Sequence, residues 1–216
     1  MNLTDGRTSE ADVANVTGIV LTGGRSSRMG EDKASLVLGG ATLLARVVAA
    51  LNALADEIVV VRAPGQSLPL VQTASTLTVV ADRVEGAGPL EGIATGLEAI
   101  TAPIALVVGV DHPFLRPTLL RLLLDEVQAG APWVLPVFEG HPQPMCSAVA
   151  AASLGAIRTA ISGGERSPAT AARSLGAVLM DEARWRTADP EGLSFWDVDT
   201  PEAFEAAARH LEGSGR

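Results

Sequence analysis

The sequence is short of cysteine, histidine and long apolar runs, and each shortage excludes a kind of protein. Its single cysteine, Cys146, allows no intramolecular disulfide, and with three scattered histidines it leaves no Cys/His set spaced as zinc ligands. No apolar run approaches the roughly 18 residues of a membrane span, and residues 1–15 are polar and lack the apolar segment of a signal peptide. We therefore expect a cytoplasmic protein in a reducing compartment, without a membrane partner.

Positive charge is also scarce, with a formal net charge of −9 and a sequence pI near 4.8. Such a chain lacks the positive field that neutralises the phosphates of nucleic acid, so we expect no nucleic-acid partner. A small anionic ligand would need a local cationic pocket. Lys33 is the only lysine among 16 basic residues. An ammonium is a compact point charge and a guanidinium is a broad planar fork, so a site that needs a point charge on a phosphate oxygen does not simply accept arginine.

Length and composition predict one domain. The chain has 216 residues, 47% of them hydrophobic, which is enough for one sizeable core and too short for two comfortable domains. From Val16 onward, short β-branched runs alternate with segments of helical periodicity, a pattern typical of helices covering a mostly parallel sheet. We therefore predict an α/β, Rossmann-like fold over residues 16–211, with a disordered N-terminus at residues 1–15 and a disordered tail at residues 212–216.

The expected strands and helices place four loops at one edge of the sheet. Strands are expected at Val16–Leu21, Glu57–Val61, Leu77–Ala81, Ala105–Val110, Trp133–Val137, Met145–Ala151 and Ser194–Val198. Helices are expected at Thr42–Ala53, Pro89–Ala99, Pro117–Ala129, Ser153–Ile161, Pro168–Leu175 and Pro201–His210. Ligands bind beyond the carboxyl ends of strands in such sheets, so a site is expected in the loops after Leu21, Val61, Ala81 and Val110. All of them except the loop after Val61 carry unusual residues.

The loop from Leu21 to Lys33, LTGGRSSRMGEDK, combines glycines with basic side chains. Glycines such as Gly23 and Gly24 let the backbone approach an anion closely, and Arg28 and Lys33 add positive charge. The segment is not a Walker A motif, because no Lys-Ser or Lys-Thr follows its last glycine, and it lacks the G-x-G-x-x-G spacing of dinucleotide folds. It predicts an anion-binding loop, and a chance glycine-rich turn is the plain alternative.

A second candidate, Asp111, follows the strand predicted at Ala105–Val110. Magnesium takes few protein carboxylates and completes its octahedron with water and phosphate oxygens, so one aspartate at a strand end predicts a metal ligand. The alternative is an aspartate that caps the next helix. The neighbouring His112 invites a role as general base or metal ligand, but a lone loop histidine is more often a hydrogen-bonded bystander.

These segments resemble the signatures of the molybdenum cofactor guanylyltransferase family. Leu21 to Lys33 is similar to the family's L-A-G-G-x-S-x-R-M-G-x-D-K, and the sequence that starts at Asp111 is similar to its Asp-x-Pro-Phe. Asp82 followed by G-P-L-x-G from Gly88, and the D-V-D-T-P-E element from Asp197, extend the match.

The resemblance implies a single-domain fold like that of the nucleotide-diphospho-sugar transferases and a magnesium-dependent nucleotidyltransferase. The implied reaction moves GMP from GTP to molybdopterin and releases pyrophosphate. Implied metal ligands are Asp111 with Asp197 or Asp199, and the implied catalytic residues are Arg28, Lys33 and Asp111. Implied nucleotide contacts are Leu21, Thr22, Gly23, Gly24, Arg28, Lys33, Asp82, Gly88 and Asp111. The resemblance also implies transient contact with the proteins that mature molybdenum enzymes.

Two departures from the family pattern bear on the substrates. Thr22 stands where the family usually has alanine, and His112 where it commonly has methionine. Gly23 leaves room for a purine, whereas the cytidylyl relatives carry alanine there, so we expect a preference for GTP that is read by the backbone of residues 21–24. The acceptor is expected near His141–Pro144 and Ser162–Ser167. The alternatives are CTP or another NTP with molybdopterin or another small phosphorylated acceptor, and a non-catalytic nucleotide-binding relative.

Overall fold

The computed structural model describes residues 15–23, 32–83 and 86–214, and its elements follow the expected alternation of strands and helices. The main sheet contains β1 (Val16–Leu21), β4 (Glu57–Arg62), β5 (Thr76–Ala81), β6 (Ile104–Gly109), β7 (Trp133–Phe138), β8 (His141–Pro142), β9 (Cys146–Ala150) and β10 (Val178–Met180). A separate hairpin pairs β2 (Val37–Leu38) with β3 (Ala41–Thr42). The helices are α1 (Leu43–Leu51), α2 (Pro89–Glu98), α3 (Pro117–Gln128), α4 (Leu154–Ser162), α5 (Pro168–Ser174), α6 (Glu182–Trp185) and α7 (Pro201–Ser214). Short 3-10 turns lie at η1 (Lys33–Ser35), η2 (Ala151–Ser153) and η3 (Leu193–Phe195).

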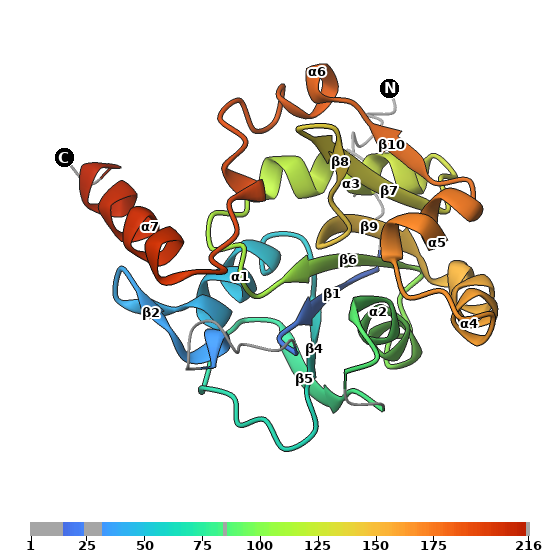
Figure 1. The fold of residues 1–216 in the computed structure, drawn as a ribbon, viewed down its shortest axis with the longest axis horizontal. Coiled ribbons are helices and arrows are strands. Elements are labelled where there is room, and N and C mark those ends of the chain that lie inside the picture. The colour runs from blue at the N-terminus through green and yellow to red at the C-terminus, as the bar shows by residue number, and fades with distance from the viewer. Residues whose placement is uncertain (1–14, 24–31, 84–85, 215–216) are drawn as a thin grey trace, which may run out of the picture.

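The main sheet is mostly parallel and is flanked by helices, as predicted (Figure 1). Its strand order is β10-β7-β9-β6-β1-β4-β5, with β8 paired to β7 alone. The run β6-β1-β4-β5 is parallel throughout, whereas β9 is antiparallel to both β6 and β7. The carboxyl ends of β1, β4, β5 and β6 therefore lie at one edge of the sheet, where the loops were expected to form a site.

Apolar clusters on the two faces of the sheet hold the layers together. Because neighbouring residues of a strand point to opposite faces, Val20 packs in the cluster with α1 and α3, whereas Ile19 packs in the cluster with α2 and α4. Gly96 permits the close approach of α2 to β1, since a Cβ there would lie 2.5 Å from Cγ2 of Ile19. No helix in the described part of the chain is long and apolar enough to cross a membrane.

The prediction of a strand at Ser194–Val198 is wrong. This segment begins as η3, and the backbone amides of Leu193 and Ser194 donate to the two carboxylate oxygens of Asp189, at 3.2 and 2.8 Å. The buried Asp189 carboxylate thus accepts the backbone hydrogen bonds that a neighbouring strand would accept in a sheet. Phe195 and Val198 are buried in the core, which explains the strand-like apolar pattern of the sequence.

Several short elements were not anticipated: β2, β3, β8, β10 and α6. Each has only two to four residues, too few for a periodic pattern to be recognised in the sequence. The helix α7 continues to Ser214, into the segment predicted as a disordered tail, and Leu211 packs against the core before that point. The N-terminal disorder predicted for residues 1–15 falls, except for Asn15, outside the described residues.

Candidate active site

The ammonium group of Lys33 joins two carboxylates from distant parts of the chain. Its Nζ lies 3.2 Å from Oδ2 of Asp111 and also contacts Oδ1 of Asp199. The side chain of Lys33 is 17% exposed, compared with 26% for Asp111 and 45% for Asp199, so the pair with Asp111 is the better shielded of the two. The tertiary structure thus brings together three of the residues that were predicted to form the site.

Asp111 is held by the backbone around it. At the end of β6, Val110 N donates to Leu21 O at 3.0 Å, which places Asp111 beside the end of β1. Asp111 O in turn accepts a hydrogen bond from Val198 N at 2.9 Å. The cap residue of α3 is Arg116, so Asp111 is not a helix cap and its side chain remains available to a cation.

Asp199 is likewise free of a capping role. The helix α7 begins at Pro201, and it is Thr200 that caps it: the Thr200 hydroxyl accepts from Ala203 N at 3.1 Å. The carboxylate of Asp199 contacts Lys33 instead. The capping alternative raised for Asp111 is therefore excluded, and Thr200 rather than Asp199 caps α7.

The pKa shifts of Asp111 and Lys33 keep both side chains charged at neutral pH. Burial acts to raise the pKa of Asp111, but the charges of His112 and Lys33 outweigh it and hold that pKa below the ordinary value of 3.8. Burial acts to lower the pKa of Lys33, and the hydrogen bond to Asp199 together with the charge of Asp111 raises it above 10.5. Burial and the charge of Asp199 raise the pKa of Asp197. Lys33 and Asp111 are therefore an ion pair at neutral pH.

The carboxylates of Asp111 and Asp199 can supply one or two ligands to a hard divalent cation. Asp111 and Asp199 already converge on one positive charge, the Lys33 ammonium, and carboxylate oxygens are the ligands that magnesium prefers. Among the described residues, no group of three or more acidic, histidine or cysteine side chains is arranged to hold a metal. Magnesium needs few protein ligands where phosphates and water supply the rest, so the residues present fit it. Asp197 lies in the same cluster, since the charges of Asp199 and Asp111 act on it, and both Asp197 and Asp199 stay candidates for the second ligand.

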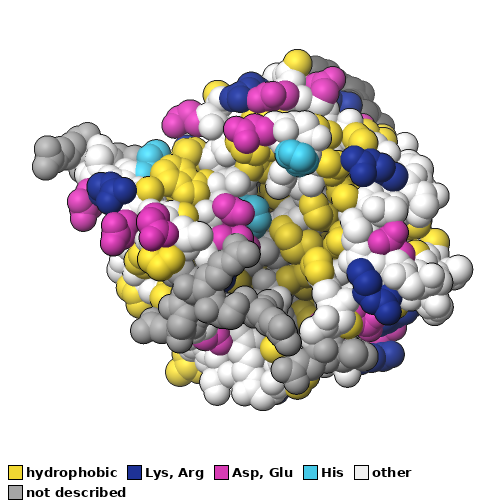
Figure 2. All heavy atoms as spheres, in the orientation of Figure 1, with side chains coloured by type: hydrophobic (Ala, Val, Ile, Leu, Met, Phe, Trp, Pro, Cys, Tyr) yellow, Lys and Arg dark blue, Asp and Glu magenta, His cyan; other side chains and the backbone are white. Residues whose placement is uncertain are grey.

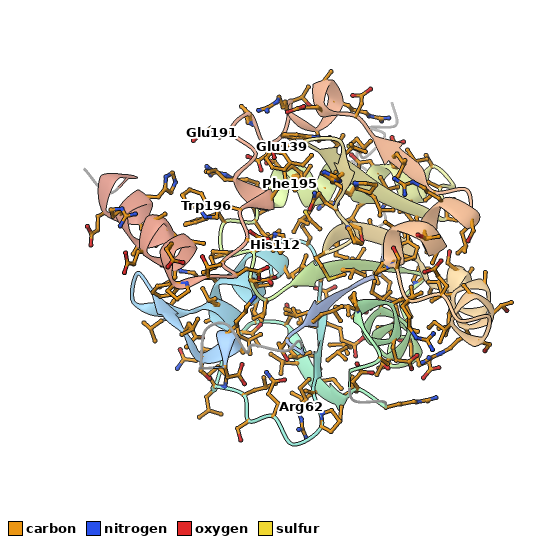
Figure 3. The ribbon with its side chains drawn as sticks, in the orientation of Figure 1. Arg62, His112, Glu139, Glu191, Phe195 and Trp196 are labelled. Atoms are coloured by element: carbon orange, nitrogen blue, oxygen red, sulfur yellow. The ribbon has the colours of Figure 1, made fainter. Side chains whose placement is uncertain are left out.

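His112 is placed to hold the neighbouring segment. Its side chain is buried, and Nδ1 lies 3.0 Å from Ser194 O; because a carbonyl only accepts, Nδ1 carries the proton. Nε2 lies 3.8 Å from Oδ1 of Asp111, beyond hydrogen-bonding distance. In Figure 3 His112 lies at the end of β6, next to the segment that carries Phe195 and Trp196. The geometry favours the hydrogen-bonded histidine over the general base.

The polar groups at the end of β1 are largely hydrogen-bonded to neighbouring strands and loops. Leu21 O accepts from Val110 N, and Thr22 N donates to Val61 O at 2.9 Å. The Thr22 hydroxyl lies 3.0 Å from Val61 O and Thr22 is buried, so this hydroxyl is engaged within the fold. Among the described residues, no hydrogen bond engages the backbone of Gly23. The base-reading role of residues 21–24 stays a prediction; Gly24 lies outside the described residues, as does Arg28.

Asp82 and Gly88 lie around the start of α2. Asp82 follows β5, and its carboxylate accepts from the Thr95 hydroxyl at 3.2 Å. Gly88 precedes Pro89 with a φ of 93°, a conformation that favours glycine, and α2 has no side-chain cap. Free amides at a helix N-terminus suit an anion. In the described part of the chain, no hydrogen bond or ion pair links these two residues to the Lys33 cluster, so they form a separate part of the same edge.

The two segments expected to bind an acceptor both border this edge. Gly109 N donates to Met145 O at 2.9 Å, so the loop before β9 lies against the end of β6. A Cβ on Gly88 would lie 3.9 Å from Arg166 O, so the loop after α4 adjoins the start of α2. The guanidinium of Arg166 donates to carbonyls of its own turn, those of Ile161 and Glu165. Figure 2 shows a hollow on this face, lined by apolar side chains with acidic ones beside it.

The loop after β4, which showed nothing unusual in the sequence, carries a residue that touches the site. The Gln66 side chain contacts both Thr22 and Asp32, which lie before and after the predicted anion-binding glycines. The dipeptide Pro64-Gly65 indicates a turn in the sequence, but no local pattern identifies the partners of the residue that follows it.

Comparison with known proteins places this geometry in a family. The model of the MobA-like NTP transferase domain matches residues 18–178. The "Probable molybdenum cofactor guanylyltransferase" of Mycolicibacterium paratuberculosis is 39% identical over 205 residues, which cover 92% of this chain and 98% of that protein. The "Molybdenum cofactor guanylyltransferase" of Desulfosudis oleivorans is 28% identical over 193 residues, which cover 89% and 94% of the two chains.

Solved structures show the same fold. The molybdopterin-guanine dinucleotide biosynthesis protein A of Archaeoglobus fulgidus superposes with a TM-score of 0.75 at 22% identity, covering 91% of this chain and 99% of that one. The 2-C-methyl-D-erythritol 4-phosphate cytidylyltransferase of Thermus thermophilus gives a TM-score of 0.68 at 22% identity, covering 92% and 99%. The fold is thus that of the nucleotide-diphospho-sugar transferases, as predicted. This chain belongs to the family of MobA-like NTP transferases and is a nucleotidyltransferase.

Proposed function

We propose that this protein is a molybdenum cofactor guanylyltransferase, which transfers GMP from GTP to molybdopterin and releases pyrophosphate. The observation that carries the proposal is the cluster of Lys33, Asp111 and Asp199 at the carboxyl edge of the sheet. Its residues fall in the segments that resemble the family, and relatives of that name cover most of the chain. We place the reaction in the cytoplasm, with transient delivery of the product to the proteins that mature molybdenum enzymes.

The reaction is an in-line attack of a phosphate oxygen of the pterin on the α-phosphate of GTP. The attacking phosphate is ionised at neutral pH and needs no general base, which agrees with a His112 whose Nδ1 is bound to Ser194 O. The protein contributes position and charge. Lys33, with Arg28 from the same loop, binds and orients the triphosphate, and Asp111 and Asp199 would hold the metal. Magnesium, when bound, neutralises charge on the phosphate oxygens.

Selection of guanine depends on the end of β1 in this proposal. The backbone of Gly23 supplies hydrogen-bonding groups for the base, and Asp82 and Gly88 contact the nucleotide from the start of α2. A pocket whose polar groups pair with guanine rejects the wrong base strongly, because a mismatched base leaves those groups unpaired. An alanine in place of Gly23 would bring Cβ to 3.3 Å from Ala63 N, so the segment has little freedom to accept a side chain.

The test is pyrophosphate release by the purified full-length protein with molybdopterin and GTP, CTP or ATP, each with magnesium or with EDTA. We expect release with GTP that requires both the acceptor and the metal, and much lower kcat/KM values for CTP and ATP. A thermal-shift panel of the same nucleotides measures binding independently. Equal use of the three nucleotides would refute the choice of base, and nucleotide binding without any release would support a non-catalytic relative instead.

A further inference from the structure

We infer that Gln66 is a positioning residue that holds the two ends of the nucleotide loop in register. The inference rests on the proposed function, because it concerns how Gly23 and Lys33 are presented to GTP. The described ends of that loop are Thr22–Gly23 on one side and Asp32–Lys33 on the other. Gln66 lies on a third segment, the turn after β4, and contacts both ends.

The carboxamide of Gln66 has a partner for every polar group it carries. Nε2 donates to the two carboxylate oxygens of Asp32, at 3.0 and 2.9 Å, and lies 3.3 Å from Thr22 O. Oε1 accepts from Ala63 N at 2.9 Å and from the Thr22 hydroxyl at 3.1 Å. The orientation of the amide follows from chemistry, because the Ala63 N–H needs an acceptor and the Asp32 carboxylate needs a donor.

The turn that carries Gln66 is itself well supported. Gln66 N donates to Ala63 O at 3.1 Å, and Pro64 and Gly65, the latter with a φ of 76°, occupy the central positions that a type II turn requires. The guanidinium of Arg62 donates to Ala63 O at 3.3 Å and to Gln66 O at 3.0 Å. Figure 3 shows Arg62 at the lower end of the molecule, well below Trp196.

The contacts of Gln66 act on the nucleotide through the residues next in the chain. Asp32 precedes Lys33 and also caps η1, accepting from Ala34 N at 3.0 Å, so a shift of Asp32 moves the lysine. Thr22 precedes Gly23 in the same way. Gln66 thus fixes the Gly23 backbone relative to the Lys33 ammonium. If only a fraction of the molecules holds that arrangement, the apparent Kd for GTP equals the intrinsic Kd divided by that fraction.

A charge swap tests this arrangement. Gln66→Glu keeps the shape of the side chain and replaces the Nε2 donor with a carboxylate oxygen facing Asp32. Asp32→Asn supplies a new donor to that oxygen, so the double variant restores the hydrogen bond with reversed polarity. Gln128→Glu, at an exposed position on α3, makes the same chemical change far from the loop in sequence and serves as the matched control. The readouts are the Kd for GTP with magnesium by calorimetry, and KM and kcat from pyrophosphate release.

We expect Gln66→Glu to raise the Kd and KM for GTP by about tenfold or more, while kcat at saturating GTP changes by less than about threefold. The control should leave Kd and KM near the wild-type values. The rise caused by Gln66→Glu should be clearly smaller in the Asp32→Asn background, because coupled residues are not additive. Gln66→Met, which removes the hydrogen bonds without adding charge, should raise Kd with kcat retained if the glutamate variant does not fold.

The outcomes separate this inference from the proposed function. An unchanged Kd in the Gln66 variants, or an equal rise in both Asp32 backgrounds, overturns the positioning role. A fall in melting temperature with unchanged KM also overturns it, since that result describes a purely structural glutamine. A wild type that neither binds nor uses GTP overturns the proposed function, and the inference with it.

Discussion

Replacing Lys33 with methionine removes the ammonium and keeps much of the side-chain length. The carboxylates of Asp111 and Asp199 then face each other without a counter-charge. The charge-assisted hydrogen bond to the partly buried Asp111 stabilises by about 1.5–3 kcal/mol, and the contact with the more exposed Asp199 adds at most about 1 kcal/mol. We expect the free energy of unfolding to fall by about 2–3 kcal/mol, which lowers Tm by roughly 4–12 °C for a chain of this length.

The same substitution should strengthen the response to magnesium in the absence of nucleotide. In the wild type a metal competes with the ammonium for the same carboxylate oxygens, whereas in Lys33→Met those oxygens are free. The assay is thermal unfolding followed by circular dichroism, with increasing MgCl₂ and with NaCl at matched ionic strength. A ligand that binds only the folded state adds about 1.4 kcal/mol of stability for each tenfold increase in concentration above its Kd.

We expect a larger magnesium-dependent rise in Tm for Lys33→Met than for the wild type, and little effect of NaCl. The double variant Lys33→Met with Asp111→Asn should lose most of that rise, because one ligand becomes an uncharged amide. A rise in Lys33→Met that is no larger than in the wild type, or one that NaCl reproduces, would refute the view that ammonium and metal share these carboxylates.

Three further predictions concern Lys33, Asp111 and Asp82. Lys33→Arg should fail to restore the turnover that Lys33→Ala loses, because a site that needs a compact point charge on a phosphate oxygen does not simply accept a broad planar guanidinium; near-normal kcat in the arginine variant would contradict this. Asp111→Asn should abolish magnesium-dependent pyrophosphate release while the circular dichroism spectrum stays native, and retained magnesium dependence would remove Asp111 from the metal site. Burial raises the pKa of Asp82 above 3.8, so its contribution to stability is present below that pH and is lost as the pH rises through the folded-state pKa. Asp82→Asn should therefore unfold at an equal or higher temperature at pH 7 while the Kd for GTP rises; a lower Tm would show that the ionised carboxylate stabilises the fold.

Much of the architecture follows from local sequence patterns. The apolar, β-branched runs at Val16–Leu21 and around Ile104–Gly109 predict buried parallel strands, because both faces of such strands are covered. Proline at the first position of α2, α3, α5 and α7 marks helix starts, since its missing N–H is not needed there. The strand at Ser194–Val198 was mispredicted because an apolar pattern indicates only that a segment is buried. Burial does not say whether a neighbouring strand or a side chain forms hydrogen bonds with its backbone.

The sequence by itself determined the α/β class, the edge at which the candidate site lies, and the candidate residues Lys33, Asp111 and Asp197 or Asp199, because each depends on short-range periodicity or on a contiguous motif. Only the tertiary structure decided that one ammonium joins the two carboxylates, 78 and 166 positions away along the chain. It also decided that the Thr22 hydroxyl turns into the fold and that Gln66 reaches Asp32 across 34 positions. Hydrogen bonds between distant segments depend on how strands and loops pack, and a pattern that repeats every two to four residues carries no information about such distances.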